Sequence, residues 1–491
     1  MSRSQRLKAR AGLLRRSGPP EGENLNTPVQ IKSNEHQEIA IVRPTSAIEL
    51  PDMRFALNLD RCVSPDRTSL FLRGWLWDPL HQLTQLELVF GGHHCSVPAA
   101  SLIRYPRPDV AVHCSTRFSD GSFDNHGFVA FVETGAPKQE RGLLRALLKN
   151  GDSAELHIQP PLDPFIAQRH ILDSIPGEPF FCSRLMADHI HPALERVRSR
   201  IPSAAAGRTI IFGKPPSDPH FTIIVPLYKR LDLMEHQLAQ FANDSTLRSC
   251  ELVYVLDDPI MSAEFEFYSF HLWQLYQVPF KVVVMTRHSG YSGANNAGAA
   301  ASSSSLVLFL NSDVFPLKAG SLTRLVALYQ HKQEVGALGC KLLYEDRSIQ
   351  HAGMYFYQDY HPNKLWINMH YYKGLPATWA GASEDRFVPA VTGATLLIRR
   401  SLFEKIGGWD ESYVLANYED SDLCLRLSKV GYSSWYCSSV EMYHLERQSQ
   451  GPGEEEAVRR NSDFYNRWLQ THRWNDLISE VMNRQRSLST R

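Results

Sequence analysis

Apolar runs of strand length alternate with helical stretches through the middle of the chain, and this alternation limits the fold more than any other feature. The apolar runs lie at 221–226, 251–256, 281–286 and 306–310. The helical stretches lie at about 232–241, 265–276 and 294–302. Parallel strands need long crossover connections, which are usually helices, so the pattern predicts an α/β domain with a mainly parallel sheet. In such sheets, ligands bind beyond the carboxyl ends of the strands.

Polar or charged groups follow all four apolar runs. In chain order, the strand ends are Pro226-Leu227-Tyr228, Asp257-Asp258-Pro259, Arg287-His288-Ser289-Gly290 and Asn311-Ser312-Asp313. Each group alone is ordinary turn chemistry, because Asp, Asn and Ser favour turns. Together, they place polar side chains at one edge of the predicted sheet, where a ligand would bind.

A second acidic cluster opens a predicted helix further along the chain. Glu419, Asp420 and Asp422 precede an apolar face that continues to Val430, and the helix ends at Gly431. A single acid there would be explained by the helix dipole, but three acids exceed that need. Because like charges hinder ionisation, a carboxylate in this cluster has a raised pKa and is a candidate general base.

A different pattern fills residues 51–165, where short apolar runs alternate with turn signals such as Gly91-Gly92. This pattern predicts a small all-β accessory domain of the sandwich type. Trp75 and Trp77 lie in one run, and we favour a core position for both over a surface that stacks on sugars. Apolar residues at steps of three to five then predict a connecting helix, with its linker, at 166–215.

Residues 1–50 differ from the rest of the chain. The first eighteen residues contain Lys and Arg but no acid, and the following stretch is rich in Pro, Asn, Glu and Gln. This composition predicts a disordered tail. Two interpretations stay open for its basic start: a solubilising tail, which we favour, and a segment that contacts an anionic membrane surface.

Composition excludes several classes of protein. At about 150 residues per domain, 491 residues allow roughly three units. The 52 Lys and Arg residues equal the 52 Asp and Glu residues, which disfavours a nucleic-acid binder. No apolar run approaches the roughly 20 residues of a transmembrane helix, and none follows the first charges as in a secretory signal. Eight scattered cysteines without C-x-x-C favour a reducing compartment. We therefore expect a cytoplasmic protein. Any peripheral membrane contact would be at the inner face of the membrane.

The ordered motifs resemble those of family 2 glycosyltransferases, of the type found among bacterial rhamnosyltransferases and polysaccharide-biosynthesis enzymes. The matching motifs are Pro226–Lys229, Asp257-Asp258, Asn311–Asp313, Thr392–Ala394, Gly408–Glu411 and Glu419–Leu427. The match runs from about 220 to 448. It implies a catalytic domain with the GT-A fold, a Rossmann-like sheet, at 216–450, followed by a helical extension at 451–491.

The resemblance also implies roles for individual residues. A nucleoside diphosphate sugar would be bound by Pro226, Leu227, Tyr228, Asp257, Asp258, Arg287, Asn296, Asn311, Ser312 and Asp313. Asp313 and His444 would hold a divalent cation, Mn²⁺ or Mg²⁺, and Asp420 would be the catalytic base. Trp409, Asp410 and Glu419 would bind the acceptor, a glycan or lipid-linked glycan of the cell envelope. The implied reaction is a metal-dependent, inverting single displacement by a non-processive enzyme.

Two features depart from this family pattern. Asn311 stands where the family has the first Asp of its D-x-D motif, which removes one anionic group from the metal site. Residues 470–474 spell the Q-x-x-R-W of processive synthases, which we interpret as coincidence because those enzymes carry transmembrane helices.

Two alternatives to an active transferase stay open. The first is a non-catalytic carbohydrate-binding protein on the same fold. The second is a Rossmann-type oxidoreductase or methyltransferase, which would need a glycine fingerprint directly after the first strand, where Pro226 to Tyr228 lie.

Overall fold

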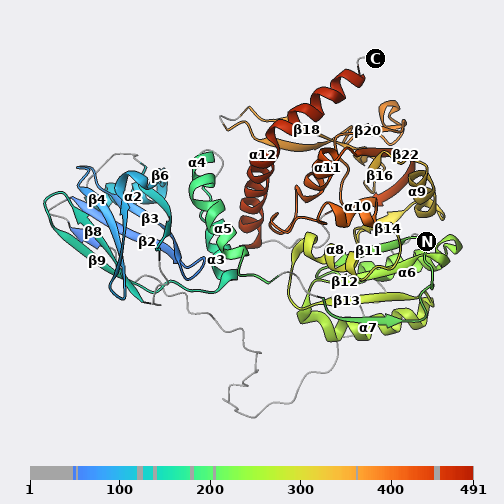
Figure 1. Cartoon of the computed structure of the whole chain (residues 1–491), viewed down its shortest axis with the longest axis horizontal. Coiled ribbons are helices and arrows are strands. Elements are labelled where there is room, and N and C mark those ends of the chain that lie inside the picture. The colour runs from blue at the N-terminus through green and yellow to red at the C-terminus, as the bar shows by residue number, and fades with distance from the viewer. Residues whose placement is uncertain are drawn as a thin grey trace, which may run out of the picture. The chain divides into compact units, whose positions relative to one another are not determined.

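The computed structural model describes residues 48–50, 54–118, 125–135, 141–176, 182–202, 206–360, 363–446 and 454–489. The predicted tail lies outside these residues, apart from its last three. Figure 1 shows the chain from its first strands to its last helix.

Two antiparallel sheets form the first region. One sheet has the order β1(Ile48–Leu50), β2(Phe55–Val63), β3(Ser69–Trp77), β7(Gly127–Glu133) and β6(Ile103–Tyr105). The other has the order β5(His93–Pro98), β4(Leu83–Phe90), β8(Gly142–Leu148) and β9(Ser153–Ile158). Their apolar side chains, including Leu57, Leu86 and Phe128, share one core, which confirms the predicted β domain. Trp75 and Trp77 are buried beside α2(Pro108–Phe118), so neither is a sugar-stacking surface.

Short helices follow the β domain. They are α3(Pro164–Leu172), α4(Ser183–Leu185), the π-helical turn η4(Met186–Ile190) and α5(His191–Arg198). Helix α3 begins where the Asp163 side chain caps the N–H groups of Phe165 and Ile166. The last three segments follow one another without a gap, so 183–198 form one helical stretch with a π-helical turn inside it, within the connecting region expected at 166–215.

An 11-stranded sheet forms the second region, in the order β10-β13-β12-β11-β14-β21-β16-β22-β15, with β17 and β20 at its side. Its first strands are β10(Ala206–Phe212), β11(Thr222–Leu227), β12(Glu251–Leu256), β13(Phe280–Met285), β14(Leu306–Leu310) and β15(Val314–Pro316). Its later strands are β16(Val335–Leu343), β17(Ile349–His351), β20(Arg386–Val388), β21(Thr395–Arg399) and β22(Ser433–His444). Strands β13, β12, β11 and β14 are parallel, which confirms the predicted parallel central sheet. Strands β10, β21 and β15 are antiparallel to their neighbours, so the sheet as a whole is mixed. A separate hairpin pairs β18(Met354–Gln358) with β19(Trp366–His370).

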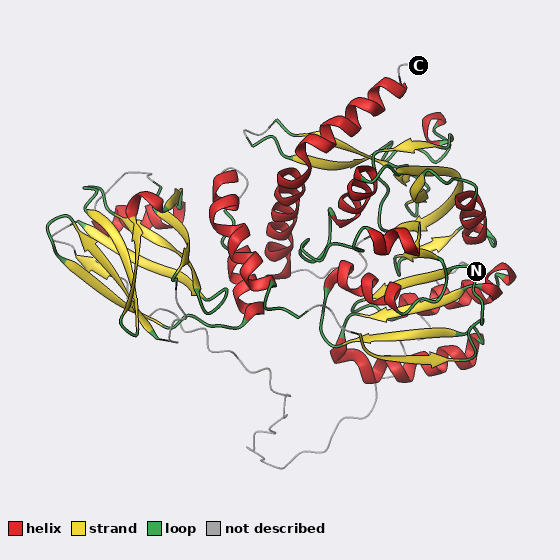
Figure 2. Cartoon of the chain, in the orientation of Figure 1, coloured by secondary structure: helices red, strands yellow, loops and turns green. Residues whose placement is uncertain are grey.

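Helices cover both faces of this sheet (Figure 2). One face packs against α6(Asp232–Ala242), α7(Ser262–Tyr276) and α9(Ser321–Gln330). The other packs against α8(Gly290–Ala300), α10(Arg400–Lys405) and α11(Glu419–Lys429). This arrangement leaves the carboxyl ends of the parallel strands as the edge on which a site can form.

Helix α8 lies unusually close to the sheet. A Cβ on Gly298 would lie 2.4 Å from Cγ2 of Ile224 and 2.9 Å from Cγ2 of Val255, so only glycine fits there. The small residues of this helix therefore serve close packing. The helix begins at Gly290, after a short turn that follows β13, and thus earlier than predicted.

The long helix α12(Glu454–Ser489) packs against two parts of the chain. Its Asn466 side chain accepts a hydrogen bond from the N–H of Val414 and donates to the carbonyls of Val414, Ala416 and Asn417. Its Tyr465 hydroxyl lies 2.9 Å from Nδ1 of His191 in α5. Across the residues that the structure describes, no helix combines the length and the apolar character needed to cross a membrane.

Candidate active site

Tyr228, Asp257 and His288 meet at the carboxyl ends of β11, β12 and β13. The imidazole of His288 stacks on the Tyr228 ring with centroids 4.4 Å apart and planes 22° apart. Its Nδ1 lies 2.8 Å from Oδ2 of Asp257, and the other oxygen of that carboxylate accepts a 2.7 Å hydrogen bond from the N–H of Ser289. The structure thus brings together two residues predicted to bind the sugar donor, Tyr228 and Asp257, and adds His288, which the sequence places at a strand end but to which it assigns no role.

The neighbouring residues that are predicted to bind the sugar donor lie in different surroundings. Leu227 is buried, and its carbonyl accepts a 2.9 Å hydrogen bond from the N–H of Asp257, which fixes the two strand ends side by side. Pro226 is half-buried. Asp258 is half-buried, and its carboxylate makes no hydrogen bond with a described residue. Arg287 instead donates to the carbonyls of Pro202 and His288, so it is tied to the linker.

The turn Asn311–Asp313 follows β14 and is anchored from two sides. The N–H of Asn311 donates to the carbonyl of Ala394 at 3.0 Å. The buried side chain of Gln237 in α6 donates to the carbonyls of Asn311 and Val314. Gln237 is a positioning residue that the sequence analysis missed, because nothing in its local sequence marks it. Ser312 lies half-buried in the same turn.

Asp313 and His444, the two predicted metal ligands, lie beside each other. Strand β15 pairs antiparallel with β22, and this brings Oδ1 of Asp313 to 3.4 Å from Nε2 of His444. The two residues are only 8% and 7% exposed. Antiparallel pairing therefore joins side chains that are far apart in the sequence.

The residues at this position fit a divalent cation. Carboxylate oxygen and imidazole nitrogen are ligands that Mn²⁺ accepts, and Oδ1 of Asn311 on the same turn is buried without a hydrogen-bond partner. Within the described ranges, no group of three or more His, Cys, Asp or Glu side chains is arranged around a common point. Such a small protein ligand set suits a cation that also binds substrate phosphate oxygens and water.

Asp420 lies at the start of α11 and faces the segment Thr392–Ala394. Its Oδ2 accepts a 3.2 Å hydrogen bond from the N–H of Gly393, and its Oδ1 accepts a 2.7 Å hydrogen bond from the N–H of Ser421. Burial raises the pKa of the Asp420 carboxyl, although these hydrogen bonds act in the opposite direction. Because Ala394 also binds the Asn311 turn, one short segment joins the candidate base to the candidate metal site.

Glu419 is buried next to Asp420, and its Oε2 has no hydrogen-bond partner. Burial, and then the charge of Asp420, raises the pKa of Glu419 well above its usual range. A protonated carboxyl at this position can donate a hydrogen bond, whereas a charged one would lack compensation.

Asp422 has a structural role. It is 1% exposed, and its carboxylate accepts hydrogen bonds from Arg426 Nε at 2.7 Å, Trp474 Nε1 at 2.7 Å and the Tyr413 hydroxyl at 3.1 Å. The contact with Arg426 lies within α11, and the contacts with Trp474 and Tyr413 hold the helix against its neighbours. Asp422 is therefore not available as a base.

The three characteristic residues of the Q-x-x-R-W motif in α12 contact either the first turn of α11 or Asp410. Gln470 accepts a hydrogen bond from the Ser421 hydroxyl, Arg473 forms a 2.7 Å ion pair with Asp410, and Trp474 binds Asp422. The sequence alone favours a coincidental match to the motif of processive synthases. In the structure, each of the three characteristic side chains has a specific partner.

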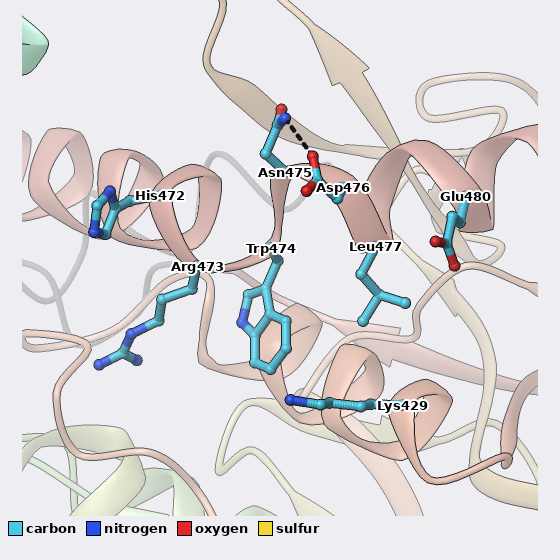
Figure 3. Close-up of a pocket in the computed structure, with 8 residues that line it drawn as sticks. All are labelled: Lys429, His472, Arg473, Trp474, Asn475, Asp476, Leu477 and Glu480. Carbon is cyan, nitrogen blue, oxygen red and sulfur yellow. Dashed lines mark hydrogen bonds between the residues drawn. The ribbon is translucent and has the colours of Figure 1, made fainter.

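A pocket lies along the same contact between α12 and α11 (Figure 3). Trp474 projects from α12 toward α11, where the ammonium of Lys429 lies 5.6 Å from its ring centroid. The pocket lining includes Arg473 and Glu480 but none of the predicted donor, metal or base residues. It is thus separate from the strand-end site.

Trp409 and Asn296 of α8 contact each other and other residues within the protein. Trp409 is buried against Tyr291 and Phe309, with ring centroids 5.2 and 5.1 Å apart, and is not on an open surface. The amide of Asn296 binds both the N–H and the carbonyl of Trp409 and also Glu411. Both side chains are therefore already engaged within the protein.

A sheet covered by helices on both faces, with carboxylates at its strand ends and an acidic helix start, agrees with the GT-A fold expected from the sequence. The family model described as "Glycosyltransferase like family 2" matches residues 218–471, about half of the chain. The chain belongs to this family. Membership confirms the predicted class of enzyme, a glycosyltransferase.

Curated relatives match parts of the chain. An uncharacterised protein, y4gI, of Sinorhizobium fredii is 29% identical over 52% of this chain and 28% of its own length. The O-antigen biosynthesis protein RfbC of Myxococcus xanthus is 29% identical over 47% of this chain and 18% of its own length. The N-acetylglucosaminyl-diphospho-decaprenol L-rhamnosyltransferase of Mycobacterium tuberculosis is 43% identical over 14% of this chain and 22% of its own length. The chain thus spans less than a third of these relatives.

Solved structures of glycosyltransferases show a distant similarity. GalNAc-T7 with UDP, GalNAc and Mn²⁺ is 15% identical, with a TM-score of 0.38 over 49% of this chain and 47% of that one. The mannosyltransferase PcManGT from Pyrobaculum calidifontis, in complex with GDP-Man and Mn²⁺, is 16% identical, with a TM-score of 0.33 over 56% of this chain and 78% of that one.

Proposed function

We propose that this chain transfers a sugar from a nucleoside diphosphate sugar to a hydroxyl group, with inversion at the anomeric carbon and with a divalent cation. The observation that carries the proposal is the link through Thr392–Ala394. This segment binds Asp420 through the N–H of Gly393 and the Asn311 turn through the carbonyl of Ala394. A candidate base and a candidate diphosphate site are therefore held by one rigid element, as single displacement requires.

The donor would lie across the strand ends. Tyr228 and the carboxylates of Asp257 and Asp258 would contact the nucleoside, and Asp313 with His444 would hold the cation near the diphosphate. When bound, a divalent cation neutralises the negative charge of a diphosphate leaving group. Asn311 would contribute a neutral oxygen where the family usually has a carboxylate, which lowers the negative charge of the site.

Asp420 would accept the proton of the acceptor hydroxyl. As the hydroxyl oxygen bonds to the anomeric carbon, the bond from that carbon to the diphosphate oxygen breaks, and the proton moves to the carboxylate. The raised pKa of Asp420 makes it a stronger base than an exposed aspartate. Hydrogen bonds from the N–H groups of Gly393 and Ser421 orient the carboxylate.

For the acceptor, we propose a glycan or lipid-linked glycan. The support is the names of the relatives, which concern O-antigen biosynthesis and transfer to a decaprenol-linked sugar. Glu419 lies beside the base, where a protonated carboxyl can bind an acceptor hydroxyl. Trp409 and Asp410 would act indirectly, because one is buried and the other is paired with Arg473.

We further propose that residues 216–450 form the catalytic domain and that 51–165 form an accessory domain. For the extension at 451–491, we propose a positioning role, since Asn466 and Gln470 contact the loop and helix that carry Asp420. Peripheral membrane contact through the basic start is the location that best suits a lipid-linked acceptor.

The experiment that tests this function is a thermal-shift screen of nucleoside diphosphate sugars with Mn²⁺ or Mg²⁺, followed by turnover measurements with the donors that bind. A ligand that binds only the folded state raises the melting temperature by mass action. We expect stabilisation by one nucleotide class and release of its nucleoside diphosphate. Binding without any turnover, even with glycan acceptors, would favour the non-catalytic carbohydrate-binding alternative.

A further inference from the structure

His288 is fixed between an aromatic ring and a carboxylate at the nucleotide end of the site. Its ring stacks on Tyr228, and its Nδ1 lies 2.8 Å from Oδ2 of Asp257 and 3.1 Å from the carbonyl oxygen of the same residue. Both partners of Nδ1 are acceptors. Nδ1 must therefore carry a proton, whatever the charge of the ring.

This arrangement leaves Nε2 as the nitrogen that titrates. Nε2 has no hydrogen-bond partner among the described residues, and the His288 side chain is 40% exposed. In the neutral ring, Nε2 can only accept a hydrogen bond; in the charged ring, it can only donate one. The same atom thus changes its recognition chemistry with a single proton.

The charged groups around His288 come from three elements. Asp257 and Asp258 follow β12 and favour the protonated ring, whereas Lys229 follows β11, with its ammonium 5.0 Å from the Tyr228 centroid. Arg287 is adjacent in the chain, but its guanidinium is directed at Pro202. The nearest charges are therefore carboxylates, and the ring is positioned to be cationic.

We propose that His288 is a donor-binding residue whose protonated Nε2 donates a hydrogen bond to an acceptor oxygen of the nucleotide, so that the protein binds nucleoside diphosphate sugars more tightly at lower pH. This inference rests on the proposed function, because it places the nucleotide at these strand ends. Nε2 would donate to an oxygen atom of the nucleotide, either a carbonyl oxygen of the base or an oxygen of the diphosphate.

The electrostatics of the ring agree with this role. Burial lowers the pKa of His288, but the hydrogen bond and the charge of Asp257 outweigh it, so the pKa lies above the ordinary value. The cationic form is complete below the ordinary histidine pKa of about 6.5 and is lost as the pH rises through the raised value. Donor affinity should fall in the same interval.

The test measures donor binding by calorimetry between pH 5.5 and 8, where the bases of the probes stay neutral, with UDP-glucose, dTDP-rhamnose and GDP-mannose as probes. These diphosphate diesters have no phosphate group that titrates in this range, so a slope reports on the protein. We expect the affinity of the accepted donor to fall about tenfold across the range, as for the loss of one charge-assisted hydrogen bond. At high pH, experiments in buffers of different ionisation enthalpy should show proton uptake on binding.

Two variants assign the effect to His288. His288→Gln keeps an amide that can bind Asp257 but cannot titrate, so its affinity should stay low and nearly independent of pH. His331→Gln is the matched control, because His331 is exposed at the end of α9 and lies outside the site. It should keep the full pH slope. The proton uptake of the unmodified chain is an independent measurement if His288→Gln folds poorly.

The outcomes separate this inference from the proposed function. A flat profile in the unmodified chain, or an unchanged slope in His288→Gln, overturns the role of His288 while donor binding upholds the function. If no nucleotide sugar binds at any pH, both fail together. A slope that persists with the free nucleoside of the accepted donor assigns the contact to the base, and a slope seen only with the nucleotide sugar assigns it to the diphosphate.

Discussion

Nε2 of His444 lies 3.4 Å from Oδ1 of Asp313, at the point where β22 passes β15. The two side chains converge because the antiparallel register pairs Val314 with His444. Such a pair, mostly buried and beside the unpartnered Oδ1 of Asn311, is suited to share a cation.

The first prediction concerns this pair. Excess chelator should abolish turnover, and either Asp313→Ala or His444→Ala should weaken Mn²⁺ binding, because each removes one of two strong ligands. Electron paramagnetic resonance of free Mn²⁺ measures the affinity without requiring activity. Asn311→Asp should have the opposite effect and tighten binding, since it adds an anionic oxygen. Full turnover in chelator, or equal Mn²⁺ affinity in all variants, would rule out this site.

The second prediction separates the acids of α11. Asp422→Ala should lower the free energy of unfolding by about 3–5 kcal/mol, because it leaves Arg426 and Trp474 without their buried partner. Urea denaturation followed by circular dichroism measures this loss. The control is Asp232→Ala, which breaks an exposed pair with Arg230 and should cost about 1 kcal/mol or less. Equal losses in the two variants would contradict the structural role of Asp422.

The third prediction is a pH dependence of stability. Because the pKa of Glu419 is raised in the folded chain, the folded state holds a proton that the unfolded state has already released. Stability should therefore fall as the pH rises from about 4.3, the ordinary glutamate value, through the raised value. Glu419→Gln should flatten this fall and raise stability at pH 8 by on the order of 1 kcal/mol or more. Melting curves between pH 5 and 8 measure the effect, and parallel curves for both proteins would show that Glu419 ionises normally.

Part of the site could be predicted because its residues follow local rules. Asp257 and Asp313 come directly after apolar runs, and Asp420 opens an amphipathic helix. Strand ends and helix starts are visible in the sequence, so these positions could be assigned without coordinates. The start of strand β21 at Thr395 depends instead on tertiary contacts, because Thr392–Ala394 leave the sheet to bind Asp420 and Asn311.

Other parts depend on contacts between distant elements and have no local signature. Gln237 and Asn466 lie in helices of ordinary composition, yet each holds the site through tertiary hydrogen bonds. The position of His288 at a strand end is visible in the sequence, but its contacts with Tyr228 and Asp257 are not. The packing of α12 on the first turn of α11 also depends on contacts between distant elements. The Q-x-x-R-W pattern is the one sign of it that we found in the sequence. Interhelical contacts of this type follow from the complete fold.

The most direct test of the account is a comparison of Asp420→Asn with the unmodified chain in transfer rate and in donor affinity on the same samples. A positioned general base contributes about a hundred- to ten-thousandfold to a proton-transfer step. We predict a loss of turnover of that size with nearly unchanged donor affinity, because the donor would be held at Asp257, Asp258 and Asp313. Near-normal turnover in Asp420→Asn, or a loss of donor binding equal to the loss of rate, would contradict the assignment of Asp420 as the base.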